Sequence, residues 1–314
     1  MRLKELTAET FENWQGVNPP ADIPHGDMPG DKVEIEAEHI EKAKTIFPLL
    51  MQELMKASQN HNSGKVAVAV CGGSGVGKSE IASLLSFYLR EAGIGAYTLS
   101  GDNYPHRIPM YNDAERLKVF REAGMRAMAK ADELNAERVE IIRNFQREEK
   151  DADSTIVTEY PWYKTYLTGG EVALDAYLGT PKETDFAEVS QIVKDFHDGD
   201  DSIYLRRMGR EDTALWYEKV DFSQVDVLLV EWTHGNSDYL EGIDVPVLLN
   251  STPEETLAHR RARNRDGKLD SPFTTMVLRL EQAKLHQQAK KAKIILSKKG
   301  EVLSFADYEK IMEK

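Results

Sequence analysis

Two hydrophobic periods alternate along this chain and predict its secondary structure. Short continuous apolar runs, typical of buried parallel strands, lie at 65–71, 96–100, 225–230, 245–249 and 294–296. Apolar residues recur at helical spacing over 37–58, 78–91, 185–197, 253–264, 272–291 and 305–313. Because strands alternate with helices, we expect an α/β fold, with a doubly wound, mostly parallel sheet and helices on both faces.

Other segments are less regular. Pro and Gly punctuate residues 1 to about 36, which predicts irregular structure there. Residues 113–148 have helical spacing but are heavily charged, and a Tyr- and Trp-rich stretch without clear periodicity follows them. Residues 203–207 and 214–220 flank Gly209 and are expected to form a hairpin.

Composition narrows the class of protein. A hydrophobic content of 41% over 314 residues is ordinary for a globular chain, and a net charge of −13 argues against a broad nucleic-acid-binding face. The single cysteine, Cys71, excludes a disulfide within the chain and is expected to be a buried, inert thiol. With no apolar run of 18 residues and no secretory leader, we expect a cytoplasmic protein without membrane or nucleic-acid partners.

The segment after the first apolar run matches the phosphate-binding pattern G-x-x-x-x-G-K-[ST]. It comprises Gly72, Gly73, Ser74, Gly75, Val76, Gly77, Lys78 and Ser79. Glycines let the backbone N–H groups wrap around phosphates, and the following helix N-terminus adds a favourable dipole. Lys78 suits the β- and γ-phosphates, and the Ser79 hydroxyl suits Mg²⁺. The sequence therefore predicts a nucleoside triphosphate site, with ATP and Mg²⁺ as cofactors.

Two carboxylates follow neighbouring strands of the predicted sheet. In such sheets ligands bind beyond the carboxyl ends of the strands, and there Asp102 follows 96–100 while Glu231 follows 225–230. Transfer of a phosphoryl group to a small hydroxyl needs one carboxylate at the hydroxyl and one at the metal. We predict the first role for Asp102 and the second for Glu231. A turn residue is the alternative for Asp102.

This set of motifs resembles the uridine kinase and phosphoribulokinase group of P-loop kinases. The resemblance covers residues 65 to about 297 and includes the phosphate loop, Asp102 with Tyr104, residues 111–114, the strand ending in Glu231 and an Arg-rich segment. It implies that Lys78 and Asp102 are catalytic, that Glu231 assists at Mg²⁺, and that Arg261 and Arg265 close over the transferring phosphate. Those two belong to an arginine cluster with Arg260 and Arg263, for which a solvated helix face is the alternative.

The resemblance also predicts a division of the chain. Residues 1–60 form an N-terminal irregular segment plus helix, 61–300 a P-loop kinase domain, and 301–314 a C-terminal helix. Within the domain, 150–220 is an inserted substrate region and 259–272 a lid. The chain departs from the group in having Trp232 directly after Glu231, where glycine is common.

The acceptor remains open at this stage. Candidate contacts, each with a structural alternative, are Tyr104, His106, Arg107, Tyr160, Arg206 and Arg207. Residues 99–103 are similar to an element of adenylylsulfate kinases, so nucleosides, sugar phosphates, glycerate, pantothenate and adenylylsulfate all stay possible. A P-loop NTPase or a regulatory nucleotide-binding protein is the alternative of another class, although no guanine-reading N-K-x-D occurs. A small-molecule acceptor and a homodimer are the expected partners.

Overall fold

The centre of the molecule is a six-stranded sheet in the order β2-β5-β1-β6-β7-β8. The computed structural model describes residues 3, 14, 16–20, 22–209, 214–252, 254–257 and 271–312. The strands are β1 Val66–Gly72, β2 Ala96–Ser100, β5 Val227–Glu231, β6 Val245–Leu249, β7 Ile294–Leu296 and β8 Val302–Leu303. All pair in parallel except β8, which is antiparallel to β7. The predicted α/β, mostly parallel fold is confirmed.

Successive residues of a strand point to opposite faces of the sheet. Both faces are buried under other elements. Val66, Val68 and Val70 pack under α1 Ala37–Ala57 and α2 Lys78–Glu91. Ala67 faces the other way, into a core formed with α6 Phe186–Asp198 and the strand β3 Ser202–Met208. Cys71 also lies on this second face, beside Tyr308 of α9 Phe305–Met312. It is fully buried, and burial raises its thiol pKa to about 12, as expected of an inert thiol.

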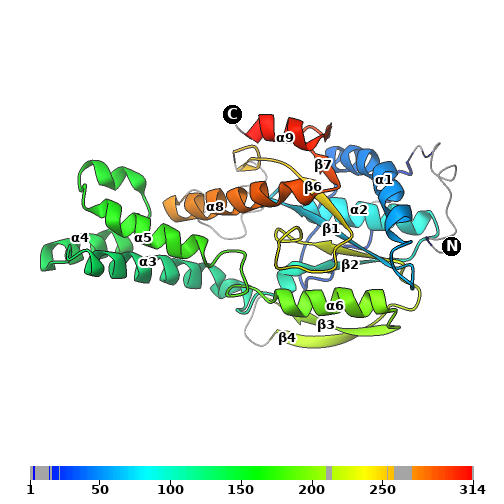
Figure 1. Cartoon of the computed structure of the whole chain (residues 1–314), viewed down its shortest axis with the longest axis horizontal. Coiled ribbons are helices and arrows are strands. Elements are labelled where there is room, and N and C mark those ends of the chain that lie inside the picture. Colours follow the sequence, from blue (N-terminus) through cyan, green and yellow to red (C-terminus); the bar gives the residue numbers. More distant parts are fainter. Residues whose placement is uncertain are drawn as a thin grey trace.

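A helical extension projects away from the sheet (Figure 1). It consists of α3 Asn112–Lys130, α4 Ala136–Arg147, the 3-10 helix η5 Ser154–Thr158 and α5 Tyr163–Asp175. Residues from the first half of α8 Pro272–Gln288 join the same core. The helices α3 and α5 approach closely, since a Cβ added to Gly170 would lie 2.5 Å from the Phe120 ring. The extension is thus a second hydrophobic core, tied to the sheet through α8.

The expected elements differ from the observed ones mainly in this extension. The predicted helical run over 113–148 consists of two helices, α3 and α4. Asp132, whose φ of 56° is left-handed, follows the end of α3, and Asn135 caps the start of α4. The stretch after it, predicted to be irregular, contains all of α5. Elsewhere the predicted hairpin is present as β3 and β4 Leu215–Asp221.

Several short elements complete the fold. They are the 3-10 helices η3 Gly101–Asn103, η4 Pro109–Tyr111 and η6 Ala289–Lys291. Most of the helix predicted over 253–264 lies outside the described residues, as does most of the expected lid. Among the described helices, none combines the length and apolarity needed to cross a membrane.

Candidate functional site

The glycine-rich loop joins β1 to α2 at the carboxyl edge of the sheet. β1 ends at Gly72 and lies between β5 and β6, so the loop is central. Gly77 caps α2 with a φ of 95°, and a Cβ there would lie 3.0 Å from the His39 ring. Both facts favour glycine at this position. The loop and the N-terminus of α2 therefore lie where the sequence predicts the phosphate site.

Glu231 lies beside this loop, at the end of β5. Its register partner on β2 is Ser100, whose hydroxyl lies 3.5 Å from a Glu231 carboxylate oxygen. Burial raises the Glu231 pKa to about 7; the charges of Asp102 and Asp31 add to this rise, whereas Lys78 and a Ser79 hydrogen bond oppose it. The structure thus brings together the phosphate loop and both predicted carboxylates.

The donor set fits a magnesium nucleotide. Ser79 hydroxyl and Glu231 carboxylate oxygens are hard ligands of the kind Mg²⁺ prefers, and they are in hydrogen-bonding contact. The Lys78 ammonium donates to the Gly73 carbonyl at 3.1 Å, across the mouth of the loop. Lys78 is thereby positioned over the surface where phosphate oxygens would lie.

A cavity of about 420 Å³ opens next to Ser79. Its polar lining consists of Asp31, Ser79, Asp102, Asn112, Asp113, Arg116, Glu183, Thr184 and His234. Its apolar lining consists of Met28, Gly101, Pro105, Pro109, Met110 and Trp232. Asp102 and Ser79 both line this cavity, so a second substrate held here would lie beside both residues.

The described lining of this cavity is negatively charged. Arg116 is its only permanent cation among the described residues, and its guanidinium is already paired with Glu183 at 2.6 Å and Glu281 at 3.4 Å. Burial disfavours the Arg116 charge, but these two carboxylates more than offset burial and raise its pKa. Burial lowers the His234 pKa to about 4, so this imidazole is neutral at pH 7. Among the described lining residues, carboxylates therefore outnumber permanent cations, and Arg116 also pairs with Asp113 at 3.6 Å.

A buried aspartate holds the segment that carries Asp102. One Asp27 carboxylate oxygen accepts from the Ser100 backbone N–H at 2.7 Å and from the Asn103 amide at 3.1 Å. The other accepts from the Tyr97 hydroxyl and the Arg207 guanidinium, each at 2.9 Å. The Asn103 carbonyl oxygen in turn accepts from the Met208 N–H. Asp27 thereby fixes both residues flanking Gly101 and Asp102.

The predicted acceptor contacts do not line the cavity. Tyr104 is fully buried, and the Arg206 guanidinium stacks 5.0 Å from its ring, with Glu188 at 3.6 Å. The His106 ring contacts the Pro181 carbonyl at 3.0 Å. Tyr104 follows the 3-10 helix Gly101–Asn103 and belongs to the hydrophobic core on the second face of the sheet.

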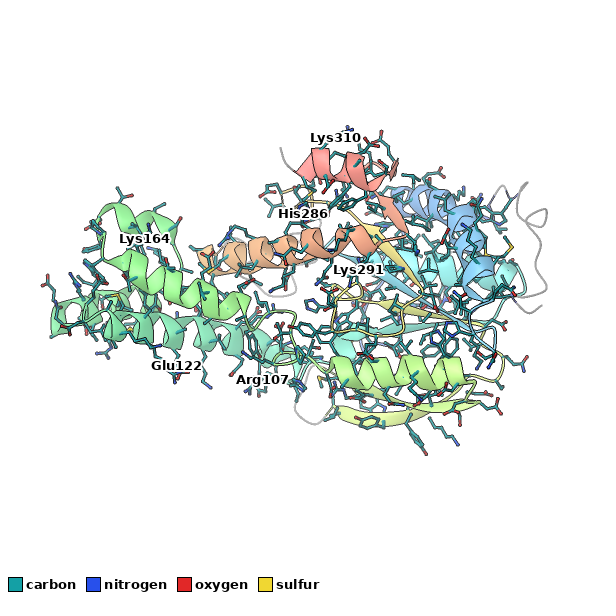
Figure 2. All side chains as sticks on the ribbon, in the orientation of Figure 1. Arg107, Glu122, Lys164, His286, Lys291 and Lys310 are labelled. Atoms are coloured by element: carbon teal, nitrogen blue, oxygen red, sulfur yellow. The ribbon has the colours of Figure 1, made fainter. Side chains whose placement is uncertain are left out.

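The remaining predicted contacts are distant or paired. Arg107 forms an ion pair with Glu115 at 3.2 Å, at the base of the helical extension (Figure 2). Tyr160 packs within the extension against Phe145 and Trp162. Arg207 binds Asp27. The arginines Arg260, Arg261, Arg263 and Arg265 lie outside the described residues.

Several lining residues gave no recognisable sequence signal. Asp31, Arg116, Glu183 and His234 come from four separate segments and belong to no motif. His234 was the most accessible to sequence reasoning, since it follows the strand that ends at Glu231. Asp27 lay in a segment expected to be irregular, where a single aspartate is unremarkable.

Comparison with known proteins supports the resemblance. Over 253 residues the chain is 40% identical to a bifunctional alpha-galactosidase/sucrose kinase, AgaSK, of Mediterraneibacter gnavus. The chain resembles a P-loop kinase. The aligned region covers 81% of this chain but only 22% of that relative. No family model matches.

Two solved structures are weakly similar. A protein named as a fructose transport system kinase, from Silicibacter sp. TM1040, is 15% identical with a TM-score of 0.41, over 77% of this chain and 90% of that one. A protein named as a uridine kinase, from Bacillus stearothermophilus, is 12% identical with a TM-score of 0.40, over 78% and 98%. Both scores lie below 0.5, so neither likeness carries weight in assigning the function.

Proposed function

We propose that this chain transfers the γ-phosphoryl group of ATP to a hydroxyl of an uncharged sugar. The observation that carries the proposal is the position of Asp102, which lines a cavity together with Ser79 of the phosphate loop. A phosphotransferase needs this arrangement of a carboxylate, an acceptor space and a phosphate cradle. The 40% identity to a protein named as a sucrose kinase supports both the reaction and the acceptor class.

The charge of the cavity favours a neutral acceptor. Among the described lining residues, Asp31, Asp102, Asp113 and Glu183 face the cavity, and the one permanent cation, Arg116, pairs with two of them, Asp113 and Glu183. A carboxylate, sulfate or phosphate on the acceptor would be repelled at such a site. This disfavours the sugar phosphates, glycerate, pantothenate and adenylylsulfate that the sequence left open.

A sugar matches the lining in a second way. Its hydroxyl groups can donate to the cavity carboxylates and exchange hydrogen bonds with neutral His234. Its C–H faces suit Trp232, which is buried apart from its cavity face, and the side chains of Met28 and Met110. Mixed apolar and polar contacts of this kind are usual in small-molecule sites.

The chain's own groups account for the chemistry. Bound Mg·ATP would supply the phosphoryl group and neutralise its charge, with Mg²⁺ held by Ser79 and Glu231 oxygens. The Asp102 carboxylate would accept the proton of the acceptor hydroxyl while the hydroxyl oxygen bonds to the γ-phosphorus. The bond between the γ-phosphorus and the ADP oxygen would break in the same transfer. Lys78 and the loop N–H groups stabilise charge on the phosphate oxygens.

An acceptor panel tests this proposal. ADP release from Mg·ATP is measured with sucrose, glucose and fructose, and with fructose 6-phosphate, glycerate, uridine and adenylylsulfate. We expect a neutral sugar to stimulate ADP release strongly, and uridine and the anionic compounds to have little effect. Stimulation by an anion would contradict the acceptor class. A rate of ADP release that none of these compounds changes would favour an NTPase or a regulatory nucleotide-binding protein.

A further inference from the structure

Two histidines and one aspartate meet at the edge of the sheet opposite the phosphate loop. His61 lies between α1 and β1, His197 in the last turn of α6, and Asp244 directly before β6. The imidazole rings stack with centroids 3.8 Å apart and an interplanar angle of 14°. The His61 Nε2 lies 2.8 Å from Oδ1 of Asp244, and the His197 Nε2 lies 2.9 Å from Oδ2. Both ring edges thus converge on one carboxylate.

This cluster is separate from the nucleotide site. The Asp244 Oδ2 atom also accepts the Ala67 backbone N–H at 2.9 Å, which places the carboxylate at the start of β1. The phosphate loop follows Gly72 at the other end of that strand. At about 3.3 Å per residue, the two ends are roughly 20 Å apart. The cluster therefore has no part in holding Mg·ATP.

The donor set is that of a transition metal. One ligand atom from each of His61, His197 and Asp244 lies within 4.8 Å of the others. Two imidazole nitrogens and one carboxylate oxygen suit Zn²⁺, whereas Mg²⁺ prefers oxygen alone. We propose that His61, His197 and Asp244 form a Zn²⁺ site that is independent of the nucleotide.

Binding one ion requires the two rings to leave their stack, because planes only 14° apart cannot both direct an Nε2 lone pair at the same point. Zinc bonds to nitrogen and oxygen are about 2.0–2.2 Å long, so tetrahedral ligand atoms lie about 3.3 Å apart. The observed nitrogen–oxygen separations of 2.8 and 2.9 Å run to different oxygens of Asp244, so one ring must also move toward the oxygen that binds the ion. Each ring then carries its proton on Nδ1 and presents an Nε2 lone pair. The His61 side chain is 23% exposed, which gives the metal an entry path and a place for a water ligand.

The site would join three segments that are far apart in the sequence. It links the segment entering β1, the end of α6 and the segment entering β6. A ligand that binds the folded chain and not the unfolded one stabilises the fold. Zinc is thus expected to raise the unfolding temperature and to leave phosphoryl transfer by the Mg²⁺-loaded protein unchanged.

Zinc binding to the full chain is the direct test. Chelator-treated protein without a histidine tag is titrated with Zn²⁺ against a chromophoric chelator, in excess Mg²⁺ and without nucleotide. We expect one equivalent at micromolar affinity or tighter. At a hundredfold excess over Kd the unfolding temperature should rise by about 5 °C. Co²⁺ should give the intense visible absorption of a tetrahedral site.

Matched variants distinguish this site from adventitious binding. His61→Gln and His197→Gln should each lower the zinc affinity at least tenfold, and the double variant should abolish the cobalt spectrum. The exposed His25, changed to Gln, is the control and should bind zinc as the wild type does. Circular dichroism checks that each variant is folded. Wild-type protein that binds no stoichiometric zinc, or zinc binding that survives in the folded double variant, would overturn the proposal and leave a metal-free hydrogen-bonded clamp.

Discussion

The carboxylates of Asp102 and Asp27 lie close in the fold but have different surroundings. These surroundings determine the role that each can have. Asp102 faces the cavity beside the phosphate loop, whereas Asp27 is enclosed by Ser100, Asn103, Tyr97 and Arg207. Burial raises the Asp27 pKa although the Arg207 charge and the hydrogen bonds oppose it. We therefore propose that Asp27 positions the segment that carries Asp102, and that Asp102 contacts the acceptor.

Asp27→Asn tests this positioning role. The asparagine side chain has the same size but lacks the charge opposite Arg207. One of the two accepting oxygens of Asp27 is replaced by an NH₂ group, which can only donate. We expect a loss of about 2–4 kcal/mol of unfolding free energy, measured by urea denaturation. We also expect a lower kcat with little change in ATP affinity. The exposed Asp22, changed to Asn, should alter neither quantity. Unchanged stability and kcat in Asp27→Asn would show that Asp27 does not hold the Asp102 segment.

His234 predicts a pH dependence of stability. Its pKa is about 4 in the folded chain against 6.5 for the unfolded one, so between these values the unfolded chain binds more protons. The stabilisation from neutral His234 is thus fully present above pH 6.5 and is lost as the pH falls toward 4. The full difference between the two pKa values corresponds to about 3 kcal/mol of unfolding free energy.

The measurement compares wild type with His234→Gln from pH 4 to 8. Glu231, whose raised pKa acts in the opposite direction, is present in both proteins and cancels in the difference. We expect the stability of wild type relative to the variant to fall as the pH is lowered through this window. A difference that does not change with pH would mean that His234 titrates normally.

At the scale of elements, the close contact between α3 and α5 holds the helical extension together. Gly124 and Gly170 let the two helices approach, and Phe120 and Tyr166 fill the contact. The sequence did not predict α5, because Gly, Thr and Tyr have modest helix propensity. Packing against α3 supplies the stability that this propensity lacks. By contrast, β1, α2 and β2 were predicted correctly, since their hydrophobic periods are uninterrupted.

Gly170→Ala tests this contact. A Cβ would lie 2.5 Å from the Phe120 ring, so the helices must separate. We expect faster amide exchange throughout α3 and α5, and a loss of about 1–3 kcal/mol in unfolding free energy. The exposed Thr168 of α5, changed to Ala, should be neutral or slightly stabilising. Unaltered exchange in Gly170→Ala would contradict the packing account.

At the scale of the whole molecule, the fold and the nucleotide half of the site were predictable, and the acceptor half was not. The phosphate loop is a contiguous pattern. Glu231 ends β5 and Asp102 lies two residues past the end of the adjacent strand β2, so topology alone brings them to the same edge of the sheet. Arg116, Glu183 and His234 reach the cavity from distant segments, and only tertiary packing shows that they meet. For the same reason the sequence left the acceptor open, and the uncharged sugar that we propose rests on the structure and the comparison.

The central claim is direct phosphoryl transfer from the phosphate loop to a neutral sugar next to Asp102. Phosphorus NMR of Mg·ATP with sucrose, comparing wild type with Asp102→Asn, tests it most directly because it separates a sugar phosphomonoester from inorganic phosphate. We expect wild type to form ADP and the monoester in equal amounts, and Asp102→Asn to be slower by about 10²–10⁴ with ATP binding intact. Inorganic phosphate as the only wild-type product, or an undiminished rate in Asp102→Asn, would contradict the claim.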